Sequence, residues 1–414
     1  MTTPRRVALQ LELKWPFERH AGVFAGTQRY AKPHGWRSII DEFVAENLPD
    51  RPAKDLPYDG VIARANTKLA DRAARLGLPL VNVWFASPAL DRLPGVYTDF
   101  AATGRLVAEH LLGRGLRHFA AMSRRERGAS VEVDAFRQTV GEAGFDCVGE
   151  QLPMDMTSSY AVQRRSEGRI HTWMDRWNPP IGVHVYGDAE ARIIAQLCLE
   201  RGWRVPEDVA IVAGFNNEQL CEHPQPALTS VDRGYERVGY EAARLLDELI
   251  DQREAGGEPS DGASESPPRK VFVPPGALII RESTDFFACD DELVAEALAF
   301  IAANSHREIG QTDVAKAVHA ETRTLQNRFR KALDRPIAAT IRQLRIERAK
   351  RELARGDRSL EAISRAVGFG AAARMYEVFR RELGVSPSEY RRQRQLETAV
   401  DSSSLGGETP GPRG

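Results

Sequence analysis

The sequence predicts an α/β domain of two lobes, followed by an all-α domain that contains two helix-turn-helix units. From Arg5 to about Asp251, short apolar runs alternate with longer amphipathic runs, whereas the pattern after Asp291 is purely helical. Repeated strand–helix alternation implies parallel sheets covered by helices, and a stretch of about 280 residues is too long for one small sheet. We therefore expect two α/β lobes in residues 1–285 and a helical domain in residues 286–396.

The expected strands of the first domain are six short apolar runs, at residues 7–13, 60–63, 80–84, 118–122, 182–186 and 209–214. The expected helices between them cover residues 23–32, 67–76, 103–113, 131–143, 189–200 and 239–252. Residues 253–269 are polar and rich in Gly, Pro and Ser, which predicts a flexible surface loop. Two strand-like runs follow that loop, at 270–273 and 277–281, and the low-complexity tail 397–414 is expected to be disordered.

Composition excludes several classes of protein. No segment approaches the roughly 20 apolar residues that a membrane span needs, and no apolar leader precedes the first strand. We therefore expect a cytoplasmic protein with no membrane contact. The four cysteines are scattered and have no histidine cluster nearby, which argues against a metal site and a disulfide framework; they are Cys147, Cys198, Cys221 and Cys289. No cofactor is expected.

The net charge of −1 conceals a strong asymmetry. Residues 305–396 contain 21 Lys and Arg but only 11 Asp and Glu, so the rest of the chain is net acidic. A compact basic segment on an acidic body is typical of a protein in which one domain meets phosphates and the other does not. Double-stranded DNA is therefore the expected partner of the C-terminal domain.

The first helix-turn-helix unit is predicted from a short helix over 312–318, a turn at His319–Ala320 and a second helix over 322–333. Apolar residues recur at helical spacing on one face of this unit. The opposite face of the second helix carries Arg323, Gln326, Asn327 and Arg330. Such side chains form bidentate hydrogen bonds with base edges in the major groove, and arginines also reach phosphates.

The second unit follows a long helix expected over 337–355. Ser359 is placed to cap a helix that runs to Val367, and Gly368 supplies a left-handed turn. The second recognition helix is expected over 372–383, with four residues as candidate DNA contacts: Ala372, Ala373, Arg374 and Glu377. A last helix over 388–395 presents basic residues to backbone phosphates: Arg391, Arg392 and Arg394.

This C-terminal stretch resembles the DNA-binding domains of the AraC/XylS family over its whole length. The motifs that carry the resemblance are residues 323–326 with Phe329, the set Ile341, Leu344, Arg345 and Ala349, and residues 359–363, 367–369 and 379–391. The resemblance implies that Arg323, Gln326 and Asn327 read bases. The second unit departs from the family pattern, because Gly370 to Ala373 stand where Ser and Gln are usual and Glu377 replaces a basic residue. Either its alanines contact thymine methyls, or the unit contributes shape and phosphate contacts.

Residues 5–285 resemble the effector domain of the LacI/GalR family, whose fold is that of periplasmic sugar-binding proteins. The resemblance rests on residues 97–99, Gly104, 110–112, Gly115, 188–191, 205–217, 226–231, Gly239 and 280–284. It implies a small sugar effector bound between the two lobes. In open α/β sheets, ligands bind in the crevice at the carboxyl ends of the strands.

Candidate ligand contacts follow from that position. Asp188, Asn216 and Asn217 end two expected strands and offer carboxylate and amide groups to hydroxyls, although Asp188 also fits a helix N-cap and the asparagines also fit a turn. The family usually has Asp where this chain has Asn216. Trp15, Phe17 and Trp84 are candidate platforms for a sugar ring, with ordinary core packing as the alternative for Trp15.

The whole arrangement, with the sensor first and the AraC-type module last, resembles regulators of pentose operons and implies xylose or a related pentose as effector. We therefore expect a sugar-controlled, sequence-specific transcription regulator that acts as a homodimer, with RNA polymerase as a further candidate partner. The alternatives are a solute-binding protein or a sugar-modifying enzyme on the same fold. The basic module opposes the former, and the lack of P-loop, G-x-S-x-G, G-x-G-x-x-G and H-E-x-x-H motifs opposes the latter.

Overall fold

The computed structural model describes residues 4–14, 18–53, 55–153, 158–255, 267–286, 291–333, 335–355 and 358–392. The chain divides into two units, Met1–Asp285 and Phe286–Gly414. Most of the expected loop 253–269 and the whole expected tail 397–414 lie outside the described residues, as do Trp15, Phe17, Cys289 and Arg394.

The first lobe of the first unit is built on a six-stranded parallel sheet with the order β11-β5-β4-β3-β1-β2. Its strands are β1 (Arg6–Gln10), β2 (Arg37–Ile40), β3 (Gly60–Ala63), β4 (Leu80–Asn82), β5 (Gly95–Thr98) and β11 (Lys270–Val273). Its helices are α1 (Glu18–Ala31), α2 (Val44–Asn47), α3 (Thr67–Arg75) and α9 (Tyr235–Glu254). The central strands β3, β4 and β5 are buried along their whole length, as expected for a sheet covered on both faces.

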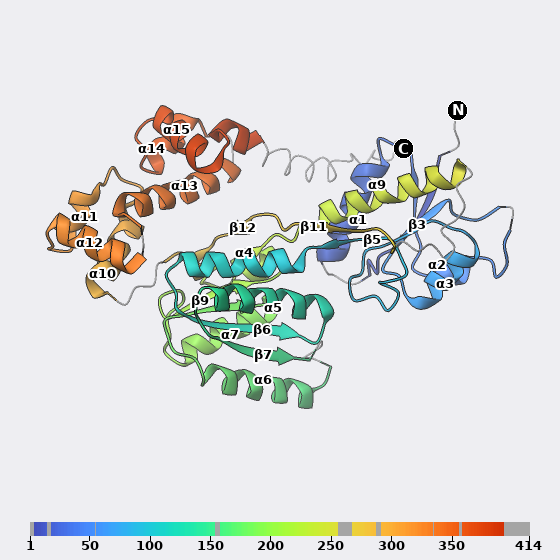
Figure 1. Cartoon of the computed structure of the whole chain (residues 1–414), viewed down its shortest axis with the longest axis horizontal. Coiled ribbons are helices and arrows are strands. Elements are labelled where there is room, and N and C mark those ends of the chain that lie inside the picture. Colours follow the sequence, from blue (N-terminus) through green and yellow to red (C-terminus); the bar gives the residue numbers. More distant parts are fainter. Residues whose placement is uncertain are drawn as a thin grey trace, which may run out of the picture. The chain divides into compact units, whose positions relative to one another are not determined.

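The second lobe has a second six-stranded sheet with the order β12-β10-β9-β8-β6-β7, in which only β12 runs antiparallel to its neighbour. Its strands are β6 (His118–Arg124), β7 (Cys147–Leu152), β8 (Ile181–Val185), β9 (Val209–Ala213), β10 (Thr229–Val231) and β12 (Leu278–Ile279). Its helices are α4 (Phe100–Gly113), α5 (Arg127–Glu142), α6 (Tyr160–Met174), α7 (Asp188–Glu200) and α8 (Glu218–Glu222), followed by a 3-10 turn (Glu282–Thr284). Figure 1 shows α5 and α6 on either side of β6 and β7.

The chain passes between the lobes three times, after β5, after β10 and after β11. The first lobe is therefore completed by α9 and β11, which come from far along the sequence. Close helix packing makes this possible, because a Cβ atom on Gly26 of α1 would lie 1.8 Å from the carbonyl oxygen of Glu236 on α9. The predicted two-lobed α/β fold is confirmed.

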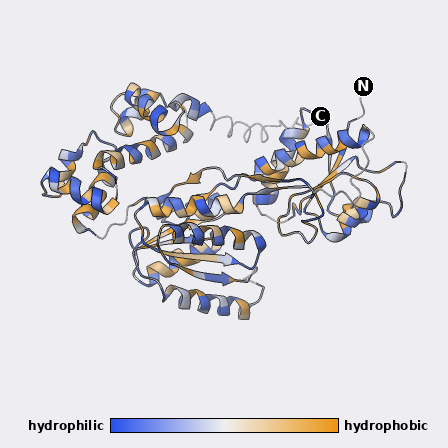
Figure 2. Cartoon of the chain, viewed as in Figure 1, coloured by the Kyte–Doolittle hydropathy of each residue, from blue (hydrophilic) through white to orange (hydrophobic). Residues whose placement is uncertain are grey.

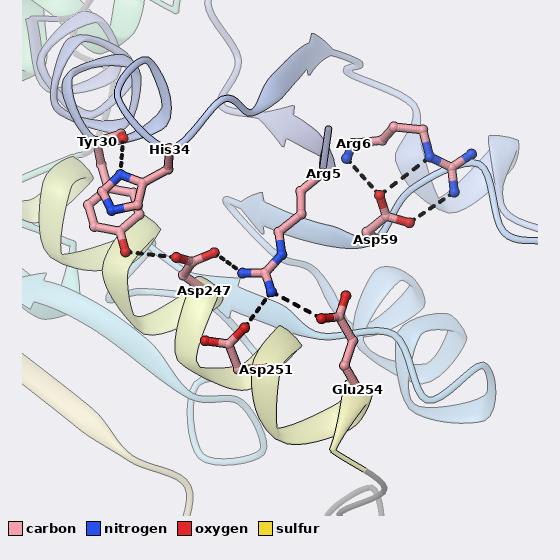
Figure 3. Close-up of polar contacts among 8 residues, drawn as sticks. All are labelled: Arg5, Arg6, Tyr30, His34, Asp59, Asp247, Asp251 and Glu254. Carbon is pink, nitrogen blue, oxygen red and sulfur yellow. Dashed lines mark hydrogen bonds and ion pairs between the residues drawn. The ribbon is translucent and has the colours of Figure 1, made fainter. Parts of the chain in front are cut away.

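The start of β1 is fastened to the C-terminal half of α9 by a charged cluster (Figure 3). The guanidinium of Arg5 contacts the carboxylates of Asp247, Asp251 and Glu254. The hydroxyl of Tyr30 donates to the other oxygen of Asp247 at 2.9 Å, and this brings α1 into the same cluster. The pKa of Tyr30 is raised, because burial and the neighbouring Asp247 both disfavour its anionic form.

All six expected strands of the first domain form, but β2, β5, β7 and β10 were not predicted as strands. The edge strand β7 shows why, because its residues Gly149 to Gln151 interrupt any apolar run and the strand is half-buried through most of its length. A strand of this kind is specified by its neighbours in the sheet rather than by its own residues.

The second unit is entirely helical within its described residues. Its helices are α10 (Glu292–Asn304), α11 (Gln311–Ala317), α12 (Thr322–Leu333), α13 (Ile337–Arg355), α14 (Leu360–Ala366) and α15 (Ala372–Leu383), and residues 387–392 are helical as well. α12, α13 and α15 have the predicted bounds. In Figure 2 these helices carry both orange and blue around their turns, as expected for amphipathic helices.

The long helix α13 serves two separate cores. Its first half packs Ile341 and Leu344 against α10, α11 and α12, whereas its second half packs Ala349 and Leu353 against α14 and α15. Each core contains one helix-turn-helix unit. The predicted double helix-turn-helix domain is therefore confirmed.

The described part of the chain offers little for other kinds of site. No group of His, Cys, Asp and Glu is arranged to hold a metal ion there. Cys147, Cys198 and Cys221 are free thiols, and burial raises the pKa of each to about 12. None of the described helices has the length and apolarity that crossing a membrane requires.

Candidate ligand pocket and nucleic-acid interface

A pocket lies between the two lobes of the first unit, where the carboxyl ends of several strands meet. The first lobe contributes residues from α1, β5, α9 and the segments after β1, β3 and β4. The second lobe contributes the first residue of α4 and the segments after β6 and β8. The lining is Leu11, Arg19, His20, Val23, Arg64, Val83, Trp84, Phe85, Tyr97, Thr98, Phe100, Glu126, Tyr186, Tyr235 and Val238.

Aromatic side chains form much of the pocket wall. The ring of Phe85 lies 5.3 Å from Phe100 and 5.6 Å from Tyr97, measured between ring centroids. The guanidinium of Arg64 lies 4.9 Å from the centre of the Trp84 ring, at the distance of a cation–π contact. Such rings provide apolar faces against which the C–H groups of a small ring can pack.

Charged groups are interleaved with these rings. Nε of Arg64 donates to the carboxylate of Glu12 at 3.2 Å, and Nη1 of Arg19 lies 4.0 Å from the carboxylate of Glu126. Burial, with a smaller contribution from the charge of Arg19, lowers the pKa of Arg64. The pocket therefore offers both donors and acceptors in a partly desolvated setting, which is what a polyhydroxylated ligand requires.

His20 is neutral at physiological pH. Burial, together with the nearby charges of Arg64 and Arg19, lowers its pKa to about 4, although the backbone carbonyl of Glu12 opposes this shift. Nε of Arg19 donates to Nε2 of His20 at 3.1 Å, so Nδ1 carries the hydrogen and donates to the carbonyl of Glu12 at 3.0 Å. His20 thus holds Arg19 at the pocket wall.

Besides the Phe85–Phe100 pair, two contacts join the lobes across this pocket. Arg19 of α1 faces Glu126, which follows β6, and the guanidinium of Arg127 lies 5.3 Å from the centre of the Phe85 ring. Both contacts would change if the lobes moved apart. The distances between these side chains in the pocket wall therefore depend on how far apart the two lobes are.

Beneath the pocket, Arg233 connects the lobes through the crossing after β10. Its backbone carbonyl accepts a hydrogen bond from Thr98 of the first lobe at 3.3 Å, while its guanidinium donates to Glu132 and to the carbonyl of Gly214 in the second lobe, at 2.8 and 2.6 Å. The guanidinium also lies 4.5 Å from the centre of the Tyr186 ring. Since Thr98 and Tyr186 line the pocket, Arg233 couples the pocket wall to the hinge.

Glu132 and Arg233 are both fully buried, and His184 shares the carboxylate at 2.9 Å. Burial by itself would lower the pKa of Arg233, but the charge of Glu132 raises it well above its usual value. The arginine therefore remains charged inside the protein.

Of the predicted ligand contacts, the structure brings Trp84 to the pocket. Trp15 and Phe17 lie outside the described residues. Asp188 is the first residue of α7 rather than its N-cap, and its carboxylate accepts hydrogen bonds from the backbone N–H groups of Phe215 at 2.9 Å and Asn217 at 2.8 Å. Asp188 is only 4% exposed and does not line the pocket.

The two asparagines are also away from the pocket lining. Asn217 caps α8, because its side-chain oxygen accepts from the backbone N–H of Leu220 at 3.0 Å. The side-chain oxygen of Asn216 accepts from Ser230 at 2.8 Å and from Arg281 at 2.9 Å. All three polar residues after β8 and β9 therefore support the turn that follows β9, and a ligand role for them stays a prediction.

Sequence reasoning missed Arg64, Glu126, Tyr186 and Tyr235 as pocket residues. The signal for Arg64 and Tyr186 was present, since Arg64 directly follows an expected strand and Tyr186 is the last residue of another. No comparable signal marks Tyr235, because it reaches the pocket from α9, whose packing against α1 is a tertiary feature.

The candidate nucleic-acid interface consists of the exposed faces of α12 and α15 in the second unit. On α12, Leu325 and Phe329 are fully buried, whereas Arg323, Asn327 and Arg330 are exposed. Gln326 is half-buried, and its amide donates to the side chain of Gln311 at 2.7 Å. The turn before α12 is formed by His319 in the left-handed conformation, with φ of 48°.

On α15, Met375 and Phe379 are fully buried, whereas Ala373, Arg374 and Glu377 are exposed and Ala372 is partly exposed. The two C-terminal arginines differ from each other. Arg392 is exposed, but the guanidinium of Arg391 donates to the backbone carbonyl of Arg358 at 2.6 Å. Phosphate contact by these residues stays a prediction.

Comparison with known protein families matches both units. Residues 108–284 match the family described as periplasmic binding protein-like domain, and residues 314–393 match a helix-turn-helix domain. The first match covers most of the second lobe and α9, and the second covers both helix-turn-helix units.

Whole-length relatives are also found. The xylose operon regulatory protein of Escherichia coli strain K12 is 28% identical over 399 residues, which cover 94% of this chain and 97% of that protein. The xylose operon regulatory protein of Haemophilus influenzae is 25% identical and covers 93% of this chain and 98% of its own length. A solved structure of the xylose-binding transcription activator xylR has a TM-score of 0.55 and 25% identity, and covers 95% of this chain and 99% of that one. The similarity thus extends over both units.

Proposed function

Since this chain is a DNA-binding transcription regulator that joins a periplasmic binding protein-like sensor to an AraC-type helix-turn-helix domain, we propose that a small sugar bound between its lobes controls it. Xylose or a related pentose is the first candidate, because the relatives that match nearly the whole chain are named for the xylose operon. The two alternatives, a solute-binding protein and a sugar-modifying enzyme, leave the helix-turn-helix domain without a role.

The observation that carries the sugar proposal is the composition of the pocket. Its aromatic wall at Trp84, Phe85 and Tyr97 suits the apolar face of a sugar ring, while Arg64 and Glu126 suit its hydroxyls. Because the pocket is lined from both lobes, a bound sugar gains contacts when the lobes close. Binding therefore shifts the equilibrium between open and closed states towards the closed state.

The protein acts as a homodimer in the cytoplasm. Closure of the lobes changes the positions of its two DNA-binding domains. Each chain presents α12 and α15 to successive major grooves, which lie about 34 Å apart along one face of the duplex. Arg323, Gln326, Asn327 and Arg330 read bases or contact phosphates from α12, and Arg391 and Arg392 contact phosphates beside α15. RNA polymerase is the further partner if the bound regulator activates transcription.

A thermal-shift and calorimetric screen of the full chain against pentoses and hexoses tests the sugar proposal. A ligand that binds only the folded protein raises the melting temperature by mass action, and xylose or a related pentose should do so. Trp84→Ala and Arg64→Ala should each weaken binding at least tenfold, whereas Arg75→Ala, on the exposed side of α3, should not. The proposal fails if no sugar binds, or if binding is unaffected by both pocket variants. Turnover of the sugar would favour the enzyme instead.

Selection of operators from randomised duplexes tests the DNA assignment. Arg323→Ala should cost roughly 1–3 kcal/mol at selected sites and relax the preference at one base pair. An unchanged sequence preference in this variant would contradict the assignment of α12 as a base-reading helix.

A further inference from the structure

The two helix-turn-helix units form an internal repeat, and the repeat identifies equivalent positions on their recognition helices. α12 and α15 both have 12 residues. Each buries its fourth and eighth residues, which are Leu325 and Phe329 in α12 and Met375 and Phe379 in α15. With these anchors superimposed, the second, fifth, sixth and ninth residues of the two helices correspond.

The corresponding outward residues have different chemistry. Arg323, Gln326, Asn327 and Arg330 of α12 correspond to Ala373, Tyr376, Glu377 and Arg380 of α15. The first set consists of amides and cations. The second set has a methyl group, an aromatic ring that is 46% exposed, a carboxylate and one cation. The second unit is therefore not a copy of the first in what it presents to DNA.

The cation of the second set already has partners within the domain. The guanidinium of Arg380 donates to Glu389 at 3.3 Å and lies 5.8 Å from the centre of the Tyr376 ring. The side chain of Glu377, by contrast, is exposed, and its carboxylate forms no hydrogen bond or ion pair with any described residue. Its carboxylate is available for contact with a ligand from outside the domain.

A free carboxylate on this face restricts what it can contact. Phosphates repel it, and in the major groove it also meets acceptors on guanine (N7 and O6) and on thymine (O4). Cytosine presents an amino donor at N4 and carries no acceptor of its own on its major-groove edge, where its other neighbour is the C5–H group, whereas adenine carries the N7 acceptor beside its amino group. An acidic residue at this position therefore favours cytosine and disfavours guanine.

We propose that Glu377 makes the second helix-turn-helix unit select a cytosine, while Ala373 and Tyr376 contact the methyl group of a neighbouring thymine. This inference rests on the proposed function, because it specifies how the same DNA-binding domain chooses its operator. It also assigns base reading to the second unit rather than phosphate contact alone. A carboxylate in this place lowers the affinity for DNA in general, so it increases the ratio of specific to non-specific binding.

The test is operator selection with the full-length protein, comparing the wild type with Glu377→Gln and Glu377→Arg. The wild type should prefer cytosine at one position of the second half of its site by about tenfold. Glu377→Gln should change that preference to adenine and Glu377→Arg to guanine, since these side chains pair with those bases. The other positions of the site should stay the same.

Glu361→Gln is the matched control, because it removes the same charge from an exposed position on α14 and should keep the wild-type preference. Circular dichroism should give wild-type melting for the Glu377 variants, since the side chain has no described partner to lose. If the wild type selects a sequence but both Glu377 variants keep its preference at every position, this inference alone is overturned. If the wild type selects no sequence, the proposed DNA-binding function is overturned with it.

Discussion

Glu132 and Arg233 carry opposite charges that no solvent reaches, at the point where the chain returns from the second lobe to the first. Ions are costly to bury, and the contact between these two opposite charges offsets part of that cost. The same arginine holds the turn after β9 through the carbonyl of Gly214. The pair thus combines a high desolvation cost with a position at the hinge.

Removing one member of this pair should be severe. We expect Glu132→Ala to lower the free energy of unfolding by about 3–5 kcal/mol, because Arg233 is left charged and buried without its partner. All six tryptophans lie before residue 204, so their fluorescence during urea unfolding reports on the first unit alone.

The control for this measurement is Glu167→Ala, which breaks an ion pair with Arg164 whose side chains are 66% and 32% exposed. Exposed pairs contribute little, so this variant should unfold nearly as the wild type does. A loss for Glu132→Ala as small as that of Glu167→Ala would show that the buried pair is not needed for stability.

A second residue-scale effect concerns pH. Burial, assisted by the charge of Arg114, lowers the pKa of His110 from 6.5 to about 3, and its Nε2 lies 2.9 Å from the hydroxyl oxygen of Thr284. The unfolded chain binds a proton near pH 6.5 but the folded chain does not, so stability decreases as the pH falls from about 6.5 towards 3.

His110→Gln keeps a side chain that can hydrogen-bond to Thr284 but cannot titrate. It should reduce the slope of stability against pH in this window by up to about 1.4 kcal/mol per pH unit. The measurement is urea unfolding at a series of pH values between 4 and 7. A variant with the same slope as the wild type would mean that His110 titrates normally in the folded protein.

At the scale of elements, the turn before α15 depends on Gly368. Its φ is +87°, and a Cβ atom there would lie 2.3 Å from the carbonyl oxygen of Ser305 and 2.9 Å from that of Arg307. Arg345 of α13 donates to the same two carbonyls. This turn, α13 and the loop after α10 therefore pack against one another, and these contacts connect the two helix-turn-helix units.

Substitution of Gly368 and of Gly384 by Ala separates two costs, that of the left-handed backbone conformation and that of the steric clash of an added Cβ atom. Gly384 has a similar φ of +72° but no atom within 4 Å of its added Cβ, so its substitution should cost about 1–2 kcal/mol from backbone strain alone. Gly368→Ala must also displace two carbonyls and should cost clearly more. Calorimetric melting of the full chain measures both, and equal costs would contradict the close packing at Gly368.

Elements also differ in how far the sequence specifies them. The helices of the second unit have strong apolar periodicity and capping signals such as Ser359, and α12, α13 and α15 begin and end at the predicted residues. Edge strands such as β7 lack a pattern of their own and depend on neighbouring strands. The prediction is accordingly better where the local signal and the packing requirement coincide.

For the whole molecule, the proposed regulation requires that sugar and operator affect each other equally. If the sugar changes operator affinity by some factor, the operator must change sugar affinity by the same factor, typically about 5–150-fold. Fluorescence anisotropy with and without sugar, and calorimetry of the sugar with and without operator, measure the two factors at one salt concentration. If the sugar leaves operator affinity unchanged and the operator leaves sugar affinity unchanged, the two units act independently.

The sequence by itself determined the order and type of the two units, because hydrophobic periodicity, turn residues and charge asymmetry are local and additive signals. It also identified the outward face of α12 and one pocket residue, Trp84. Only the tertiary structure decided which polar residues line the pocket. Asp188, Asn216 and Asn217 have the right chemistry and position along the chain, but in the structure they hydrogen-bond to nearby groups and do not line the pocket, and their ligand role stays a prediction. Arg19 and Tyr235 reach the pocket because α1 packs on α9, a contact between segments about 200 residues apart that no local pattern encodes.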